Sequence, residues 1–143
     1  MHQDDISVAQ RIADGAGNIA DVQVDLAGAT GDVAELRELF GSLSVVIGTR
    51  LHSCIIAMSA GTPAVGLAYQ YKSLGTFQVL GLEDYCLDVE SFAPAHVEQL
   101  AAELAEDRGR QRDVVTKRVG NAQRRIQAFY AQHLRQGVPD PDD

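Results

Sequence analysis

Residues 44–72 read SVVIGTRLHSCIIAMSAGTPAVGLAYQYK, and this stretch decides the fold. Two short apolar runs, at 45–47 and 64–68, enclose a longer apolar segment at 51–60 that stops at a Gly-Thr-Pro turn. Short apolar runs bounded by turn residues are typical of buried strands, whereas the longer segment between them is typical of a helix. The pattern therefore predicts strand, helix, strand, which is one βαβ unit of a parallel sheet.

The rest of the chain continues this alternation in both directions. Residues 20–26 alternate like a strand with one covered face, and the run at 85–89 predicts another short strand. Apolar residues at helical spacing predict helices at 6–13, 33–40, 73–80 and 94–107, and one long helix or two at 108–136. We therefore predict an α/β fold, a Rossmann-like parallel sheet of about four strands flanked by helices.

The domain organisation follows from the length and from the order of the elements. A chain of 143 residues suits one domain with a single core. We expect this domain to span 1–136 and to lack its first strands, because the chain opens with a helix pattern where a doubly wound domain would open with a strand. Residues 137–143 are expected to form a disordered tail. The Arg and Lys side chains of 108–136 are interpreted as a solvated face.

Composition excludes several classes of function. The formal net charge of -8 disfavours general nucleic-acid binding, which needs clustered Lys and Arg. No apolar run reaches membrane-spanning length, and the first residues do not form a signal peptide. Cys54 and Cys86 lie in apolar surroundings without CxxC spacing, so we expect buried free thiols in a cytoplasmic protein.

Polar groups gather where the two central strands end. Thr49, Arg50 and His52 follow the first strand, and Tyr69 and Lys72 follow the second. In parallel sheets, functional groups lie at the carboxyl ends of the strands, where helix N-termini add partial positive charge. A guanidinium suits carboxylate or phosphate, and an imidazole can transfer a proton near neutral pH. These residues predict an anion-binding crevice.

Plainer roles are open for the same side chains. Arg50 could pair with one of the many acids, His52 could tie down a loop, and Lys72 could simply be exposed. No GxGxxG fingerprint, P-loop, zinc-ligand spacing or Ser-His-Asp order is present, so neither a nucleotide cofactor nor a metal is predicted.

Four short motifs occur in order: IGTRLH at 47–52, AGTP at 60–63, AYQYK at 68–72 and LGLEDY at 80–85. Together they resemble the polysaccharide pyruvyl transferase family. The resemblance implies an enzyme of the glycosyltransferase GT-B type, with two Rossmann-like halves facing a cleft. It further implies transfer of the pyruvyl unit of phosphoenolpyruvate onto a pair of sugar hydroxyls of a cell-surface polysaccharide, forming a ketal.

The same resemblance suggests roles and partners. It implies that Arg50 holds the donor, that His52 acts as general acid, that Lys72 offsets phosphate charge, and that Thr49 and Tyr69 contact substrate. This chain would correspond to the later part of the C-terminal half, so its expected partners are phosphoenolpyruvate, a saccharide acceptor, and either a missing N-terminal domain or a second copy. Two alternatives stay open: another GT-B enzyme of nucleotide sugars, such as a glycosyltransferase or a UDP-N-acetylglucosamine 2-epimerase, or a truncated non-catalytic interaction domain.

Overall fold

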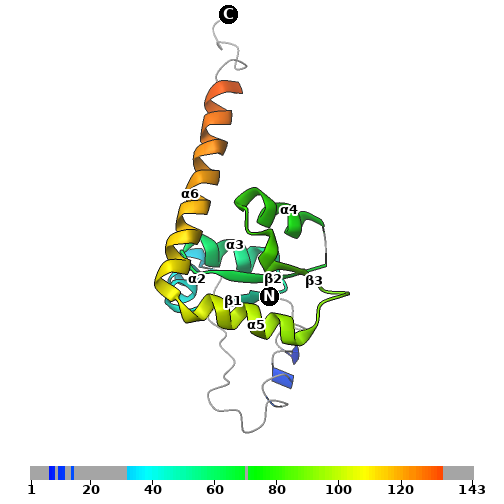
Figure 1. Cartoon of the computed structure of the whole chain (residues 1–143). Helices are drawn as coiled ribbons and strands as arrows, with labels where there is room; N and C mark the ends of the chain where they lie inside the picture. Colours follow the sequence, from blue (N-terminus) through cyan, green and yellow to red (C-terminus); the bar gives the residue numbers. More distant parts are fainter. Residues whose placement is uncertain (1–6, 9, 12–13, 15–31, 70, 134–143) are drawn as a thin grey trace, which may run out of the picture.

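The structure, a computed structural model, describes residues 7, 8, 10, 11, 14, 32–69 and 71–133 (Figure 1). Its sheet has three parallel strands in the order β1 (Val46–Gly48), β2 (Ala64–Ala68) and β3 (Cys86–Asp88). The predicted α/β class, the parallel pairing and three of the four predicted strands are therefore confirmed. The fourth prediction, at 20–26, lies outside the described residues.

Helices alternate with these strands, as the sequence pattern predicts. After the helical residues Ser7, Val8, Gln10, Arg11 and Asp14, the helices are α2 (Val33–Ser42), α3 (Leu51–Ser59), α4 (Tyr71–Leu80), α5 (Pro94–Glu106) and α6 (Arg108–His133), with a 3₁₀ turn η2 at Glu83–Tyr85. α4 begins two residues before its predicted start. The region predicted as one helix or two is a single helix to His133, and the predicted tail lies beyond the described chain.

Local chemistry explains where several helices begin and end. The Asp32 carboxylate accepts a hydrogen bond of 2.8 Å from the Ala34 backbone N–H and so caps α2. Pro94 occupies the first turn of α5, where its missing N–H costs no helical hydrogen bond. Gly61 follows α3 with a φ of 82°, a left-handed conformation that glycine adopts without strain. These stop and start signals are all visible in the sequence.

The core lies on both faces of the sheet. Figure 1 shows α3 and α4 on one side of the strands and α5 on the other. The first side buries Val46, Cys54, Ala57, Met58, Ala64, Phe77, Leu82 and, from α6, Val115. The second side buries Val65 of β2 against Leu100 and Leu104 of α5. Burying each large apolar side chain contributes about 1.5–3 kcal/mol, so α5 is held mainly by its two leucines.

A guanidinium group joins the start of α6 to the ends of α2 and α3. Arg112 donates hydrogen bonds to the carbonyls of Gly41 (2.9 Å) and Ala60 (3.1 Å) and to the hydroxyl of Thr62 (3.2 Å). Arg108 donates to the carbonyl of Ser42 at 2.8 Å. The prediction of a solvated basic face is wrong for Arg112, because this side chain satisfies carbonyls that the helix ends leave unpaired.

The second half of α6 projects from the body of the protein (Figure 1). Here three large apolar side chains are about half exposed: Ile126 at 53%, Phe129 at 58% and Tyr130 at 55%. The Phe129 ring stacks on His133 with ring centroids 4.4 Å apart. Within the described part of the chain, no helix is both long enough and apolar enough to cross a bilayer.

Candidate functional site

The three parallel strands end at one edge of the sheet, and the predicted anion-binding residues begin there. β1 ends at Gly48, Thr49 follows in the turn, and Arg50 precedes α3 with an extended backbone (φ -99°, ψ 125°). His52 is the second residue of α3. The side chains of Thr49, Arg50 and His52 are exposed, so the structure brings all three to the surface beside the N-terminus of a nine-residue helix.

The tight passage from β1 to α3 depends on small groups. The Ser53 hydroxyl donates a hydrogen bond of 2.6 Å to the carbonyl of Arg50, and the Ser53 backbone N–H donates to the same carbonyl at 3.1 Å. A Cβ atom at Gly48 would lie 2.6 Å from Cys54 Sγ, so only glycine lets the strand approach the first turn of the helix this closely. This packing positions Arg50 and His52.

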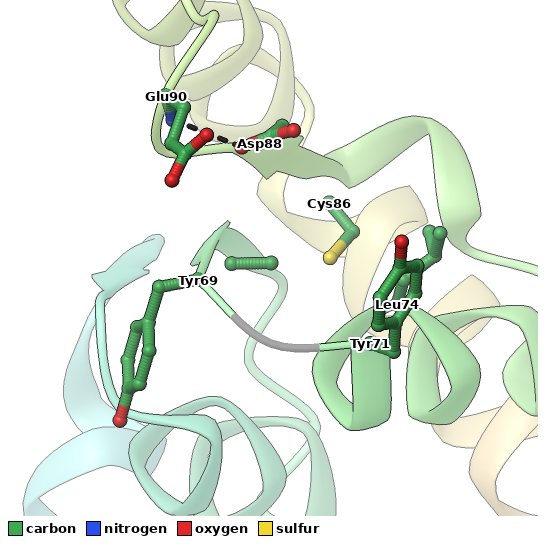
Figure 2. Close-up of a pocket in the computed structure, with 7 residues that line it drawn as sticks. Tyr69, Tyr71, Leu74, Cys86, Asp88 and Glu90 are labelled. Atoms are coloured by element: carbon green, nitrogen blue, oxygen red, sulfur yellow. Dashed lines mark hydrogen bonds between the residues drawn. The ribbon is translucent and has the colours of Figure 1, made fainter.

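A pocket of about 350 Å³ lies beside the ends of β2 and β3 (Figure 2). Its lining consists of Ala68, Tyr69, Tyr71, Leu74, Cys86, Asp88 and Glu90. Figure 2 shows Tyr71 beside Leu74 on one side of the pocket and Asp88 and Glu90 on the β3 side, whereas the Tyr69 ring points away from the two acidic residues. The Glu90 backbone N–H donates a hydrogen bond of 2.9 Å to Asp88 Oδ1, which holds the two acidic residues together.

Asp88 and Glu90 are functional candidates that the sequence reasoning missed. A usable signal was present, because Asp88 lies near the C-terminal end of the strand predicted at 85–89 and ends the observed β3, at the same sheet edge as Arg50 and Tyr69. In the prediction from sequence, Asp88 is part of this strand and has no assigned functional role. The pairing of β3 with β2 brings both carboxylates to the pocket.

Lys72 lies in a different cavity from Tyr69. It lines a groove of about 470 Å³ between α3, α4 and α6, together with apolar side chains such as Ile55, Val79 and Ile126. Thr49 lines a small hollow between the ends of β1 and β2, and Ala68 borders both this hollow and the β2–β3 pocket. The sheet edge therefore gathers Thr49, Arg50, His52 and Tyr69, while Lys72 faces the helical layer.

The two cysteines are unpaired thiols, as predicted. Burial raises the pKa of Cys54 to about 11, and the same cause raises the pKa of the half-buried Cys86. Both thiols are therefore protonated at neutral pH, which makes them poor nucleophiles. Among the residues that the structure describes, no group of three or more His, Cys, Asp and Glu side chains is arranged to hold a metal ion.

Comparison with known proteins identifies the class to which this edge of the sheet is similar. The family model described as polysaccharide pyruvyl transferase matches residues 3–71, a segment that contains β1, α3, β2 and the four polar residues of the edge. The resemblance drawn from the sequence motifs is thereby confirmed for this segment.

One curated relative is the amylovoran biosynthesis protein AmsJ of Erwinia amylovora. It is 51% identical to this chain over 57 residues, which are 40% of this chain and 14% of that protein. No solved structure gives a significant match. The two-domain GT-B arrangement stays a prediction.

Proposed function

We propose that this chain forms part of a polysaccharide pyruvyl transferase, which moves the pyruvyl group of phosphoenolpyruvate onto a pair of sugar hydroxyls as a ketal. One observation supports this most directly. Within the segment that matches the family, Arg50 and His52 are exposed together at the carboxyl edge of the sheet, beside the N-terminus of α3.

The charge of the donor fits this end of β1. Phosphoenolpyruvate carries a carboxylate and a phosphate, and a guanidinium binds either group through two parallel hydrogen bonds. The backbone N–H groups at the start of α3 add partial positive charge. In a chain of net charge -8, the donor must be bound by local groups of this kind, because the overall field repels it.

His52 supplies the proton that the reaction needs. In the proposed sequence, its imidazolium donates a proton to the methylene carbon of the donor, which becomes a methyl group and leaves an oxocarbenium-like centre at the neighbouring carbon. One sugar hydroxyl attacks this centre and returns its proton to His52. The imidazolium then protonates the phosphate as its bond to carbon breaks, and the second hydroxyl attacks, passes its proton to His52 and completes the ketal. The proposed phosphate contact of Lys72 receives no support from its position in the α3–α4–α6 groove.

Donor binding tests this proposal on the chain as it stands. Saturating phosphoenolpyruvate should raise the thermal unfolding temperature, because a ligand at 100 times its Kd stabilises the folded state by about 2.7 kcal/mol. Arg50→Ala should weaken binding by at least about 10-fold, since it removes charge-assisted hydrogen bonds worth about 1.5–3 kcal/mol each. Arg124→Ala is the matched control, because Arg124 is exposed on α6 and, among the described residues, hydrogen-bonds only Asn121 of the same helix.

The alternatives give different results in the same assay. Protection by a UDP-sugar but not by phosphoenolpyruvate would assign the chain to a nucleotide-sugar enzyme and refute the proposal. Equal affinity of the wild-type chain and Arg50→Ala for phosphoenolpyruvate would remove the assigned donor site. In a longer protein that has transferase activity, His52→Ala should reduce kcat far more than donor affinity, and an unchanged rate would contradict its acid role.

A further inference from the structure

The pocket at the ends of β2 and β3 has the wrong charge for the donor and suitable chemistry for a sugar. We infer that it is the acceptor subsite, in which Asp88 and Glu90 accept hydrogen bonds from saccharide hydroxyls while the exposed Tyr71 offers apolar surface to the sugar ring. This inference rests on the proposed function and adds to it the position of the second substrate.

The negative charge of the pocket favours binding of a neutral sugar over binding of the anionic donor. Two carboxylates repel a doubly anionic donor. The repulsion energy between two like charges 4 Å apart is about 1 kcal/mol in water and about 4 kcal/mol near a protein surface. A neutral hydroxyl instead donates a charge-assisted hydrogen bond to such a carboxylate, and these bonds are stronger than those between neutral groups. Among the described residues, the Glu90 carboxylate has no hydrogen-bond donor, so it is available to a ligand.

The shape of the pocket also suits a sugar unit. Its volume of about 350 Å³ is at the lower end of the range for small-molecule sites. Tyr69 and Tyr71 both line the pocket and are 56% and 95% exposed; Tyr71 lies beside Leu74 near Cys86, and the Tyr69 ring points away from the carboxylates (Figure 2). Large exposed aromatic side chains beside a polar pocket offer apolar surface to the C–H faces of a ring, while the carboxylates bind its hydroxyls.

The pocket lies close enough to the proposed donor site for the two substrates to react. Neighbouring strands lie about 4.8 Å apart, so the ends of β1 and β3 are separated by about 10 Å. Tyr69 follows the strand between them, and Ala68 borders both the acceptor pocket and the hollow at Thr49. A donor held at Arg50 and a sugar held at Asp88 would therefore meet near the end of β2.

Nuclear magnetic resonance of the isotope-labelled chain can test the two subsites separately. Titration with methyl galactoside, methyl glucoside and methyl mannoside at tens of millimolar should shift the amide signals of Ala68, Tyr69 and Glu90. Phosphoenolpyruvate should shift those of Arg50 and His52. The double variant Asp88→Asn, Glu90→Gln should weaken saccharide binding at least 5-fold and leave the donor response unchanged.

Matched variants make the outcome decisive. Glu98→Gln, an exposed position on α5, should leave saccharide binding unchanged, and Arg50→Ala should abolish only the donor response. The inference is overturned if no sugar shifts the pocket signals, if the carboxamide variant binds sugars as the wild type does, or if the pocket responds to methylammonium instead. If phosphoenolpyruvate shifts no signals of the wild-type chain, the proposed function is refuted. The three results that overturn the acceptor subsite would leave the proposed function intact.

Discussion

Replacing Arg112 by methionine should destabilise the protein far more than the same change elsewhere on α6. The guanidinium of Arg112 donates three hydrogen bonds, to the carbonyls of Gly41 and Ala60 and to the hydroxyl of Thr62. Thr62 is fully buried, and the two carbonyls lie at the C-terminal ends of α2 and α3, where no intrahelical donor reaches them. Methionine keeps an unbranched stem and a similar helix propensity but donates no hydrogen bond.

The magnitude follows from these three bonds. A hydrogen bond that involves a charged group contributes about 1.5–3 kcal/mol, and water can reach the partly exposed carbonyls once the guanidinium is gone. Allowing for that compensation, Arg112→Met should lower the free energy of unfolding by about 2–4 kcal/mol. This is a large part of the 5–15 kcal/mol that stabilises a typical domain, stated here as an order of magnitude.

Urea unfolding followed by circular dichroism measures the effect. With a denaturant slope of about 1–3 kcal/mol per molar urea, the midpoint should fall by roughly 1–2 M. Arg124→Met removes an equal charge from the exposed part of α6 and should change stability by less than about 0.5 kcal/mol. Arg112→Lys keeps the charge without the planar fork and should fall between the two. Equal midpoints for Arg112→Met and Arg124→Met would refute the reasoning.

Three further predictions concern Gly48, Gly75 and Cys54. Gly48→Ala should destabilise by about 1–3 kcal/mol, because the new methyl would lie 2.6 Å from Cys54 Sγ; thermal unfolding at the wild-type temperature would contradict this. Gly75→Ala in α4, where the new methyl would meet no atom within 4 Å apart from its own helix backbone, should instead stabilise by about 0.5–1 kcal/mol in the same assay. Because burial raises the pKa of Cys54 from 9.0 to about 11, its stabilising effect should be complete below pH 9 and disappear as the pH rises through 11. Unfolding free energies over this range should show that decline in the wild type and less of it in Cys54→Ala; parallel curves would exclude Cys54 as the cause.

Much of the fold could be read from the order of residues, because the signals are local. Strand and helix periods depend on neighbours a few residues apart, and they locate β1, α3 and β2 closely. Caps and stops such as Asp32, Gly61 and Pro94 act within one turn of the chain, so their effects are visible without a partner. The clustering of Thr49, Arg50 and His52 follows equally directly, since they are adjacent in sequence.

Contacts between distant segments needed the tertiary structure. Lys72 is three residues from Tyr69, yet the two line different cavities, because α4 begins between them and turns Lys72 toward α6. Arg112 meets carbonyls about 50 and 70 residues away, and no local period encodes that approach. The acidic pocket exists because β3 pairs beside β2, a choice made by packing α4 and α5 on opposite faces of the sheet. The chain order thus specifies its elements, and long-range packing decides which side chains share a site.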